Sequence, residues 1–165
     1  MFIDAIKIHW DRVPEESYLR KIPALAELDN LPLTAPVTFL TGENGSGKST
    51  LLEAAAIAAG FNPEGGTRNY LFSTRDSQSA LYEALTLSRG VHRPRWGYFL
   101  RAESFYNVAT LEEEYADLGH PSQHLHERSH GESFLAVTGK QLRPEGLYFL
   151  DEPRPLPHGP PPEAG

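Results

Sequence analysis

Residues 42–49 constrain the possible fold of this chain more than any other stretch does, because they match every fixed position of the pattern G-x-x-x-x-G-K-[ST]. Glycines let successive backbone N–H groups turn toward one anion. Lys48 would then reach the β- and γ-phosphates of a nucleotide, and the Ser49 hydroxyl would ligate Mg²⁺. A glycine-rich turn before a helix is the structural alternative, but the complete pattern favours a phosphate site. The residues assigned to nucleotide binding are Gly42, Glu43, Asn44, Gly45, Ser46, Gly47, Lys48, Ser49 and Thr50.

The sequence on either side of this loop supplies the context that it requires. Residues 37–40 form a short apolar run with β-branched and aromatic side chains, which predicts a strand. Residues 49–59 are rich in alanine and leucine and are followed by Gly60, which predicts a helix with a C-terminal stop. The order strand, turn, helix indicates an α/β P-loop NTPase fold, with a mainly parallel sheet flanked by helices.

Further elements are expected along the chain. An apolar opening over residues 2–8 predicts an antiparallel N-terminal strand element at a sheet edge. Residues 24–28 predict a short helix, and residues 78–88 show a helical pattern of leucines. Residues 96–100 and 147–150 predict strands. Three other elements are expected, namely a strand at 70–73 and helices at 104–118 and 132–141.

The composition narrows the classes of protein to consider. The chain has 15 lysines and arginines against 22 acidic residues, a net charge of −7, which argues against a dedicated nucleic-acid binder but leaves room for a local basic patch. The absence of cysteine excludes disulfides and cysteine nucleophiles. No stretch reaches the roughly 18 apolar residues of a membrane span. Residues 1–10 include Asp4 and Lys7 and are unlike a secretory signal, so a cytoplasmic protein is expected.

An acidic pair follows the apolar run at residues 147–150. Alone, a strand that ends in Asp151 and Glu152 is a weak signal. After a phosphate loop, an aspartate at the end of a neighbouring strand is expected beside the Ser49 hydroxyl, where it holds Mg²⁺ through water. Glu152 is then expected to face the γ-phosphate and to polarise the attacking water as a general base.

Residues 129–133 read Ser-His-Gly-Glu-Ser and precede a predicted short helix. Ser129 and Glu132 stand three positions apart, the spacing of a capping box that stabilises a helix start. In isolation this structural interpretation is the better one. A hydroxyl and backbone N–H groups at a helix N-terminus also bind phosphate. This second interpretation gains weight when the segment is taken together with the phosphate loop and the acidic pair.

The order of these motifs resembles the ATP-binding-cassette superfamily of ATPases, in which a phosphate loop, an L-S-G-G-Q/E signature and an apolar strand ending in Asp-Glu-Pro follow one another. Arg128 and His130 depart from the leucine and the first glycine of that signature. The closer resemblance is to small soluble bacterial AAA-type ATPases of this superfamily. Four stretches carry it, namely residues 42–54, 61–66, 98–105 and 129–133.

The resemblance implies a domain over residues 1–153 that binds ATP with Mg²⁺ and hydrolyses it. In this superfamily two protomers sandwich two ATP molecules. Ser129 and Gly131 would therefore contact the γ-phosphate in the partner protomer's site, and an ATP-dependent homodimer is expected. The short separation between Lys48 and Ser129 suits a small helical lobe over residues 74–135 rather than a long coiled-coil insert.

Two other functions stay open, a nucleotide-binding module without turnover and the ATPase subunit of a membrane transporter. Transporter cassettes carry a glutamine after the strand that follows the phosphate loop. Gln78 stands in a helical context that does not match this position. Arg101 and Glu103 follow the strand predicted at 96–100 and are better placed than Gln78 to occupy the position of that glutamine. A surface ion pair explains these two residues equally well.

Residues 154–165 depart from the family pattern. Proline cannot donate to a hydrogen-bond ladder, and six of the 14 prolines follow Leu150, so a disordered or polyproline-like tail is expected. The protomer-contact loop, the switch histidine and the last strands of the family would then be missing, which would weaken dimerisation and hydrolysis. A shifted reading frame is our hypothesis for the break, and a natural proline-rich linker is the alternative.

Overall fold

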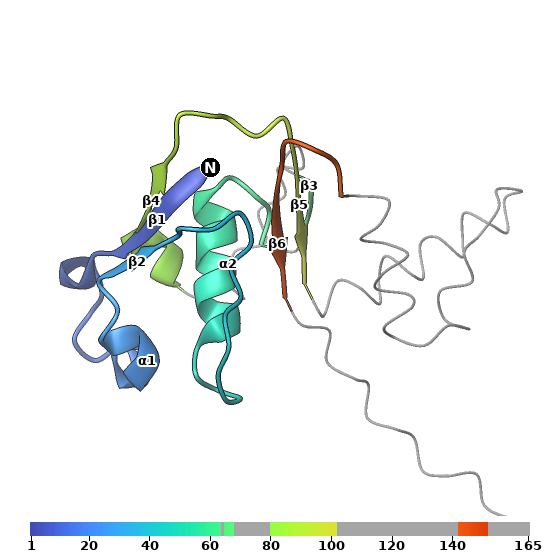
Figure 1. Ribbon diagram of the computed structural model, residues 1–165. Helices are drawn as coiled ribbons and strands as arrows, with labels where there is room; N and C mark the ends of the chain where they lie inside the picture. The colour runs from blue at the N-terminus through green and yellow to red at the C-terminus, as the bar shows by residue number, and fades with distance from the viewer. Residues whose placement is uncertain (64, 68–79, 102–141, 152–165) are drawn as a thin grey trace, which may run out of the picture.

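The chain is described by a computed structural model over residues 1–63, 65–67, 80–101 and 142–151 (Figure 1). Within these residues, two small sheets lie on either side of one helix, α2, which spans Lys48–Ala58. Several predictions fall outside the described residues, namely the strand at 70–73, the helices at 104–118 and 132–141, most of the lobe at 74–135 and the tail at 154–165.

The first sheet is antiparallel and has the order β2-β1-β4. Its strands are β1 (Ile3–Ile8), β2 (Asn30–Pro32) and β4 (Leu85–Arg89). The predicted antiparallel N-terminal element is therefore present. Its placement at a sheet edge is wrong, because β1 hydrogen-bonds to β2 on one side and to β4 on the other. The apolar pattern of β1 says which face is buried, but it does not say how many neighbours the strand has.

The helix predicted over residues 78–88 is wrong in its second half. A 3-10 helix, η3, spans Ala80–Ala84, and strand β4 follows directly. Leucines in β4 alternate with hydroxyl-bearing residues at a period of two, which suits a strand with one buried face. The central strand β1 supplies the hydrogen-bonding partner for this stretch.

The second sheet has the order β3-β5-β6. Its strands are β3 (Gly66–Thr67), β5 (Trp96–Leu100) and β6 (Gly146–Leu150). The strands predicted at 96–100 and 147–150 are confirmed. They run parallel and in register, from Trp96 opposite Gly146 to Leu100 opposite Leu150. Among the described strands this is the one parallel pair, so the sheets seen here are mixed rather than mainly parallel.

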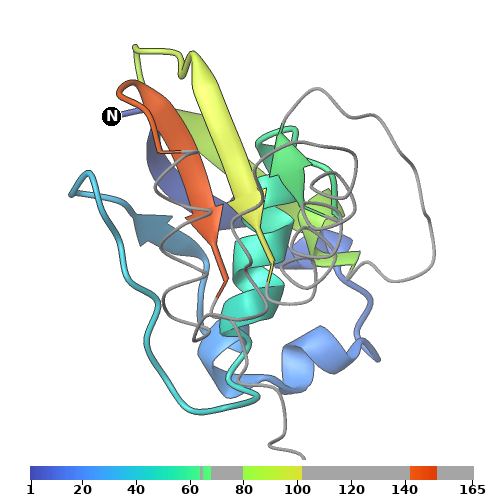
Figure 2. The ribbon, with the colours of Figure 1, turned by 90° about the vertical axis from the view of Figure 1, so that its right-hand side faces the viewer.

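Helix α2 confirms the helix predicted at 49–59 and forms the centre of the core between the two sheets (Figures 1 and 2). Its alanines at positions 54, 55 and 56 are buried, and their small side chains let the backbone approach both sheets closely. On the β5–β6 side, the rings of Phe61 and Phe149 pack edge to face, with centroids 5.6 Å apart. These contacts fix the position of the helix relative to the parallel strand pair.

The strand predicted at residues 37–40 is not formed. The side chains of this run are mostly exposed, with Val37 at 66% and Phe39 at 84%. A strand needs a hydrogen-bonding partner, and none of the described strands pairs with this run. Local apolar composition predicted the element, but composition cannot supply the neighbour.

The segment between β1 and β2 folds into three short helices, η1 (Trp10–Arg12), η2 (Tyr18–Lys21) and α1 (Pro23–Ala26). Helix α1 agrees with the short helix predicted at 24–28. Arg20 ties the segment together, because its Nη2 donates to the Val13 carbonyl at 2.7 Å and its guanidinium lies over the Trp10 ring. This packing places α1 beside the start of α2.

Candidate functional site

The loop at residues 42–47 turns the chain into α2 with glycine at its strained positions. Gly47 precedes the first helical residue and has φ +92°. A Cβ atom at this position would lie 2.9 Å from Cδ1 of Leu25 in α1. Both the left-handed backbone and the close approach of Leu25 therefore require glycine here. The sequence pattern reflects this steric demand directly.

Lys48 folds back over the loop. Its Nζ donates to the carbonyl oxygens of Gly42 and Glu43, each at 2.7 Å. The ammonium group thus closes the loop on itself and stands beside the N-terminus of α2, which carries a partial positive charge. The first turn of α2 contains no acidic residue to offset these charges. The arrangement is an electropositive site built from one side chain and a helix end.

The structure brings together Ser49 and Asp151, which are 102 positions apart in the chain. The Ser49 hydroxyl donates to Oδ1 of Asp151 at 3.0 Å. Asp151 is the first residue after β6, and its backbone N–H donates to the Leu100 carbonyl of β5 at 2.8 Å. The parallel pairing of β5 and β6 therefore carries the carboxylate to the first turn of α2. The hydroxyl and the carboxylate thus lie side by side, as the sequence predicted.

One turn further along α2, Glu53 pairs with Arg101, the first residue after β5. Arg101 Nη2 lies 2.8 Å from Glu53 Oε2, and the two side chains are only 17% and 11% exposed. Arg101 Nη1 also donates to the Pro63 carbonyl at 2.7 Å. The ion pair of Arg101 seen here is therefore largely buried, and the alternative of a surface pair between Arg101 and Glu103 is not tested, because Glu103 lies outside the described residues.

Glu53 was not among the residues singled out from the sequence, although a signal for it exists. Residues four apart on a helix share a face, so Glu53 lies on the same side of α2 as Ser49. Arg101 and Asp151 each follow one of two neighbouring parallel strands. Both strand ends are thus joined to one face of α2, and the buried pair helps to hold Ser49 opposite Asp151.

The remaining predicted site residues divide into two groups. Thr50 lies in the first turn of α2, next to Ser49. Glu152, Ser129, Gly131 and Glu103 lie outside the described residues. In the part of the chain that is described, no group of three or more His, Cys, Asp or Glu side chains is arranged to hold a metal, and no helix there is long and apolar enough to cross a membrane.

A helix that begins at a glycine-rich loop, with a lysine over that loop and a serine facing a strand-end aspartate, defines a P-loop NTPase. A family model described as "AAA domain, putative AbiEii toxin, Type IV TA system" matches residues 37–133, more than half of the chain. The chain therefore belongs to this family of AAA-type P-loop ATPases. Membership of this family implies an α/β P-loop fold and, in general terms, nucleotide-binding ATPase activity. Comparisons with curated proteins and with solved structures each gave no match.

Proposed function

We propose that this chain binds ATP with Mg²⁺ at the loop over residues 42–50 and hydrolyses it as a cassette-type ATPase that dimerises on ATP. The observation that carries the proposal is the contact between Ser49 and Asp151. It joins the first turn of α2 to the end of β6, which is the junction that a phosphate loop needs to become a nucleotide site.

The phosphates would be held by groups at the start of α2. Backbone N–H groups of residues 45–49 and the helix N-terminus favour anions. The Lys48 ammonium already stands over the loop and would add its charge to the β- and γ-phosphates. Phosphate oxygens would then compete with the carbonyls of Gly42 and Glu43 for its N–H groups.

The donor set at Ser49 and Asp151 fits Mg²⁺. Both are oxygen ligands, and Mg²⁺ in nucleotide sites is usually held by one or two protein groups together with phosphates and water. When bound, this ion neutralises phosphate charge in the transition state. In this arrangement Ser49 and Asp151 orient the nucleotide, and the Arg101–Glu53 pair fixes their separation.

Two roles rest on the resemblance to cassette ATPases. Glu152, the neighbour of Asp151, would accept a proton from the attacking water. Ser129 and Gly131 would bind the γ-phosphate of the nucleotide held by a second copy of the chain. The family match extends to residue 133 and thus includes this signature stretch.

The test of the proposal is ATP binding by the full chain, measured by calorimetry in the presence of Mg²⁺. Lys48→Ala is expected to weaken binding roughly tenfold or more, since a charge-assisted hydrogen bond contributes about 1.5–3 kcal/mol. Lys7→Ala removes an exposed lysine of β1 and serves as the matched control. Unchanged binding by Lys48→Ala would refute the assignment of the site.

Turnover and assembly need separate measurements. Steady-state phosphate release by the native chain, abolished in Glu152→Gln, is the expected result for an ATPase. ATP binding without phosphate release would instead identify a nucleotide-binding module. Size-exclusion chromatography of Glu152→Gln with and without ATP tests dimerisation, and an elution volume that does not respond to ATP would contradict that part of the proposal.

A further inference from the structure

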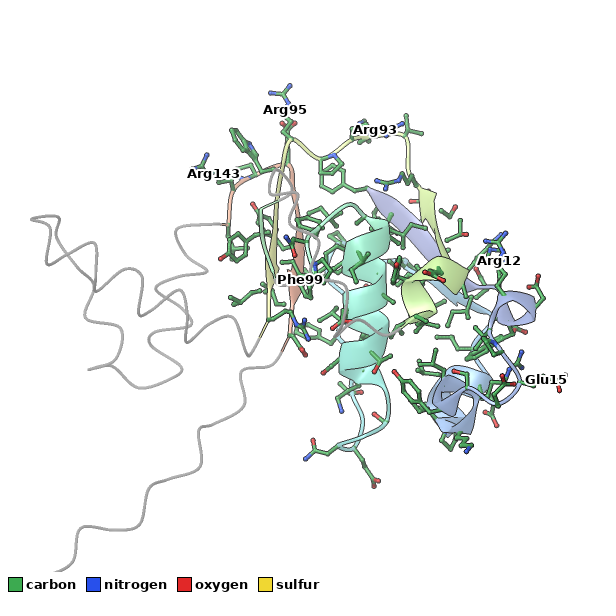
Figure 3. All side chains as sticks on the ribbon, turned by 180° about the vertical axis from the view of Figure 1, so that it is seen from behind. Arg12, Glu15, Arg93, Arg95, Phe99 and Arg143 are labelled. Carbon is green, nitrogen blue, oxygen red and sulfur yellow. The ribbon has the colours of Figure 1, made fainter. Side chains whose placement is uncertain are left out.

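A basic surface lies at the N-terminal ends of β5 and β6. We call it the arginine face and define it by Arg93, Arg95, Trp96 and Arg143. All four residues are exposed, and Figure 3 shows the three arginines at one end of the molecule. The sequence between Glu83 and Glu103 contains no acidic residue, in a chain whose net charge is −7. The positive charge is therefore concentrated locally.

The sheet holds the arginine face in place. The backbone N–H of Arg95 donates to the Glu145 carbonyl at 2.9 Å, and Trp96 stands opposite Gly146 in the parallel pair. The Tyr148 hydroxyl exchanges hydrogen bonds with the backbone N–H and carbonyl of Arg143, at 2.7 and 3.1 Å. These bonds fix the turn that carries Arg143 before any partner is present.

An aromatic ring lies among these charges. The Arg143 guanidinium carbon is 4.8 Å from the centroid of the Trp96 ring, and Trp96 is 49% exposed. Arg95 pairs with Glu145 at 3.1 Å across exposed side chains, a weak and solvated contact. Among the described residues, Arg93 and Arg143 form no ion pair. The face thus presents net positive charge together with a large planar side chain.

We propose that the arginine face binds single-stranded nucleic acid. Exposed arginines contact phosphates, and an aromatic ring stacks on an unpaired base, the combination that single-strand binders use. A duplex keeps its bases stacked inside, so Trp96 would find no base to stack on. The carboxylates of an acidic peptide would satisfy the arginines but would not stack on the ring. The strand-specific chemistry therefore favours a single-stranded partner.

The arginine face is separate from the nucleotide site. Asp151 directly follows β6 and accepts a hydrogen bond from Ser49 in the first turn of α2. The nucleotide site thus lies at the C-terminal end of β6 and the arginine face at its N-terminal end, and Figure 1 shows how far this strand runs. Binding at the arginine face therefore needs no ATP, and its success or failure does not depend on the function proposed above.

The experiment is fluorescence anisotropy with the full chain and labelled oligothymidylate, oligouridylate and a duplex of the same length, without ATP. The triple variant Arg93→Ala, Arg95→Ala and Arg143→Ala is expected to lose affinity for both single strands by at least about tenfold. The slope of log affinity against log salt should also become shallower by about 2, since each single-strand phosphate contact contributes about 0.7.

The matched control removes three positive charges elsewhere, through Lys7→Ala, Arg12→Ala and Lys21→Ala. All three residues are exposed, and Figure 3 shows Arg12 well away from the arginine face. This control keeps the net charge equal to that of the first triple variant. Equal affinity in the two triple variants would overturn the proposal, as would the absence of single-strand binding by the native chain at low salt.

Stacking has its own readout. Trp10 and Trp96 are the two tryptophans of the chain, so Trp10→Phe leaves Trp96 as the reporter. Oligothymidylate is expected to quench the emission of Trp96. In the native background, Trp96→Ala is expected to weaken binding about tenfold, and Trp96→Phe is expected to restore part of that loss. Duplex binding as tight as single-strand binding, or equal competition by polyglutamate, would overturn the proposal. Circular dichroism verifies that each variant is folded.

Discussion

The two ends of the β5–β6 pair differ in how their charged residues are held. At the C-terminal end, Arg101 and Glu53 form an ion pair whose side chains are only 17% and 11% exposed. At the N-terminal end, Arg95 and Glu145 form a pair whose side chains are 76% and 62% exposed. A buried pair fixes the separation of two elements, whereas a solvated pair opens easily to a partner. One strand pair thus serves a rigid site at one end and an accessible surface at the other.

The largest effect is expected at the buried pair. Arg101→Ala leaves the Glu53 carboxylate buried without this partner and should lower the free energy of unfolding by about 3–5 kcal/mol. Urea denaturation of the full chain measures this change. The matched test is the double exchange of Glu53→Arg with Arg101→Glu, which should recover part of the loss. A loss in Arg101→Ala no larger than that of Arg95→Ala would remove the distinction between the two ends.

A second prediction concerns Gly47, which precedes α2 and packs against Leu25 of α1. Gly47→Ala would force a side chain into the left-handed region and against Leu25, at a cost of about 1–3 kcal/mol from the backbone alone. Gly45→Ala is the control, because Gly45 also has positive φ, at +80°, but a methyl group added there would have no heavy atom within 4 Å. Thermal denaturation should show the greater loss for Gly47→Ala, and equal losses would mean that the contact with Leu25 contributes nothing.

The smallest effect is expected at the exposed pair. Arg95→Ala should change the free energy of unfolding by about 0–1 kcal/mol, because solvent screens a surface pair. High salt should reduce even this difference, since the Debye length shortens to about 3 Å at 1 M. Urea denaturation at low and high salt measures both quantities. A loss of several kcal/mol in the free energy of unfolding would show that Arg95 stabilises the fold as a buried residue does, which would contradict the comparison.

Local signals in the sequence predicted the parts of the molecule that depend on neighbouring residues. The glycine loop, helix α2 and the two parallel strands follow from steric demand, alanine content and apolar runs. The contact between Ser49 and Asp151 spans 102 positions and was predicted from the complete phosphate-loop pattern together with a carboxylate at a strand end. The failures are all non-local. None of the described strands pairs with residues 37–40, and β1 pairs with two strands instead of one. Glu53 pairs with an arginine 48 positions away in the chain, and its spacing from Ser49 indicates a shared helix face but not this partner.

The proposal that this chain binds ATP with Mg²⁺ depends most directly on the carboxylate of Asp151. If Asp151 and Ser49 hold Mg²⁺ beside the phosphates, Mg²⁺ should raise the ATP affinity of the native chain, measured by calorimetry with and without the ion. Asp151→Asn keeps the size of the side chain and should lose this Mg²⁺-dependent gain while retaining the affinity measured without Mg²⁺. An Asp151→Asn chain with the full Mg²⁺-dependent gain would contradict the account.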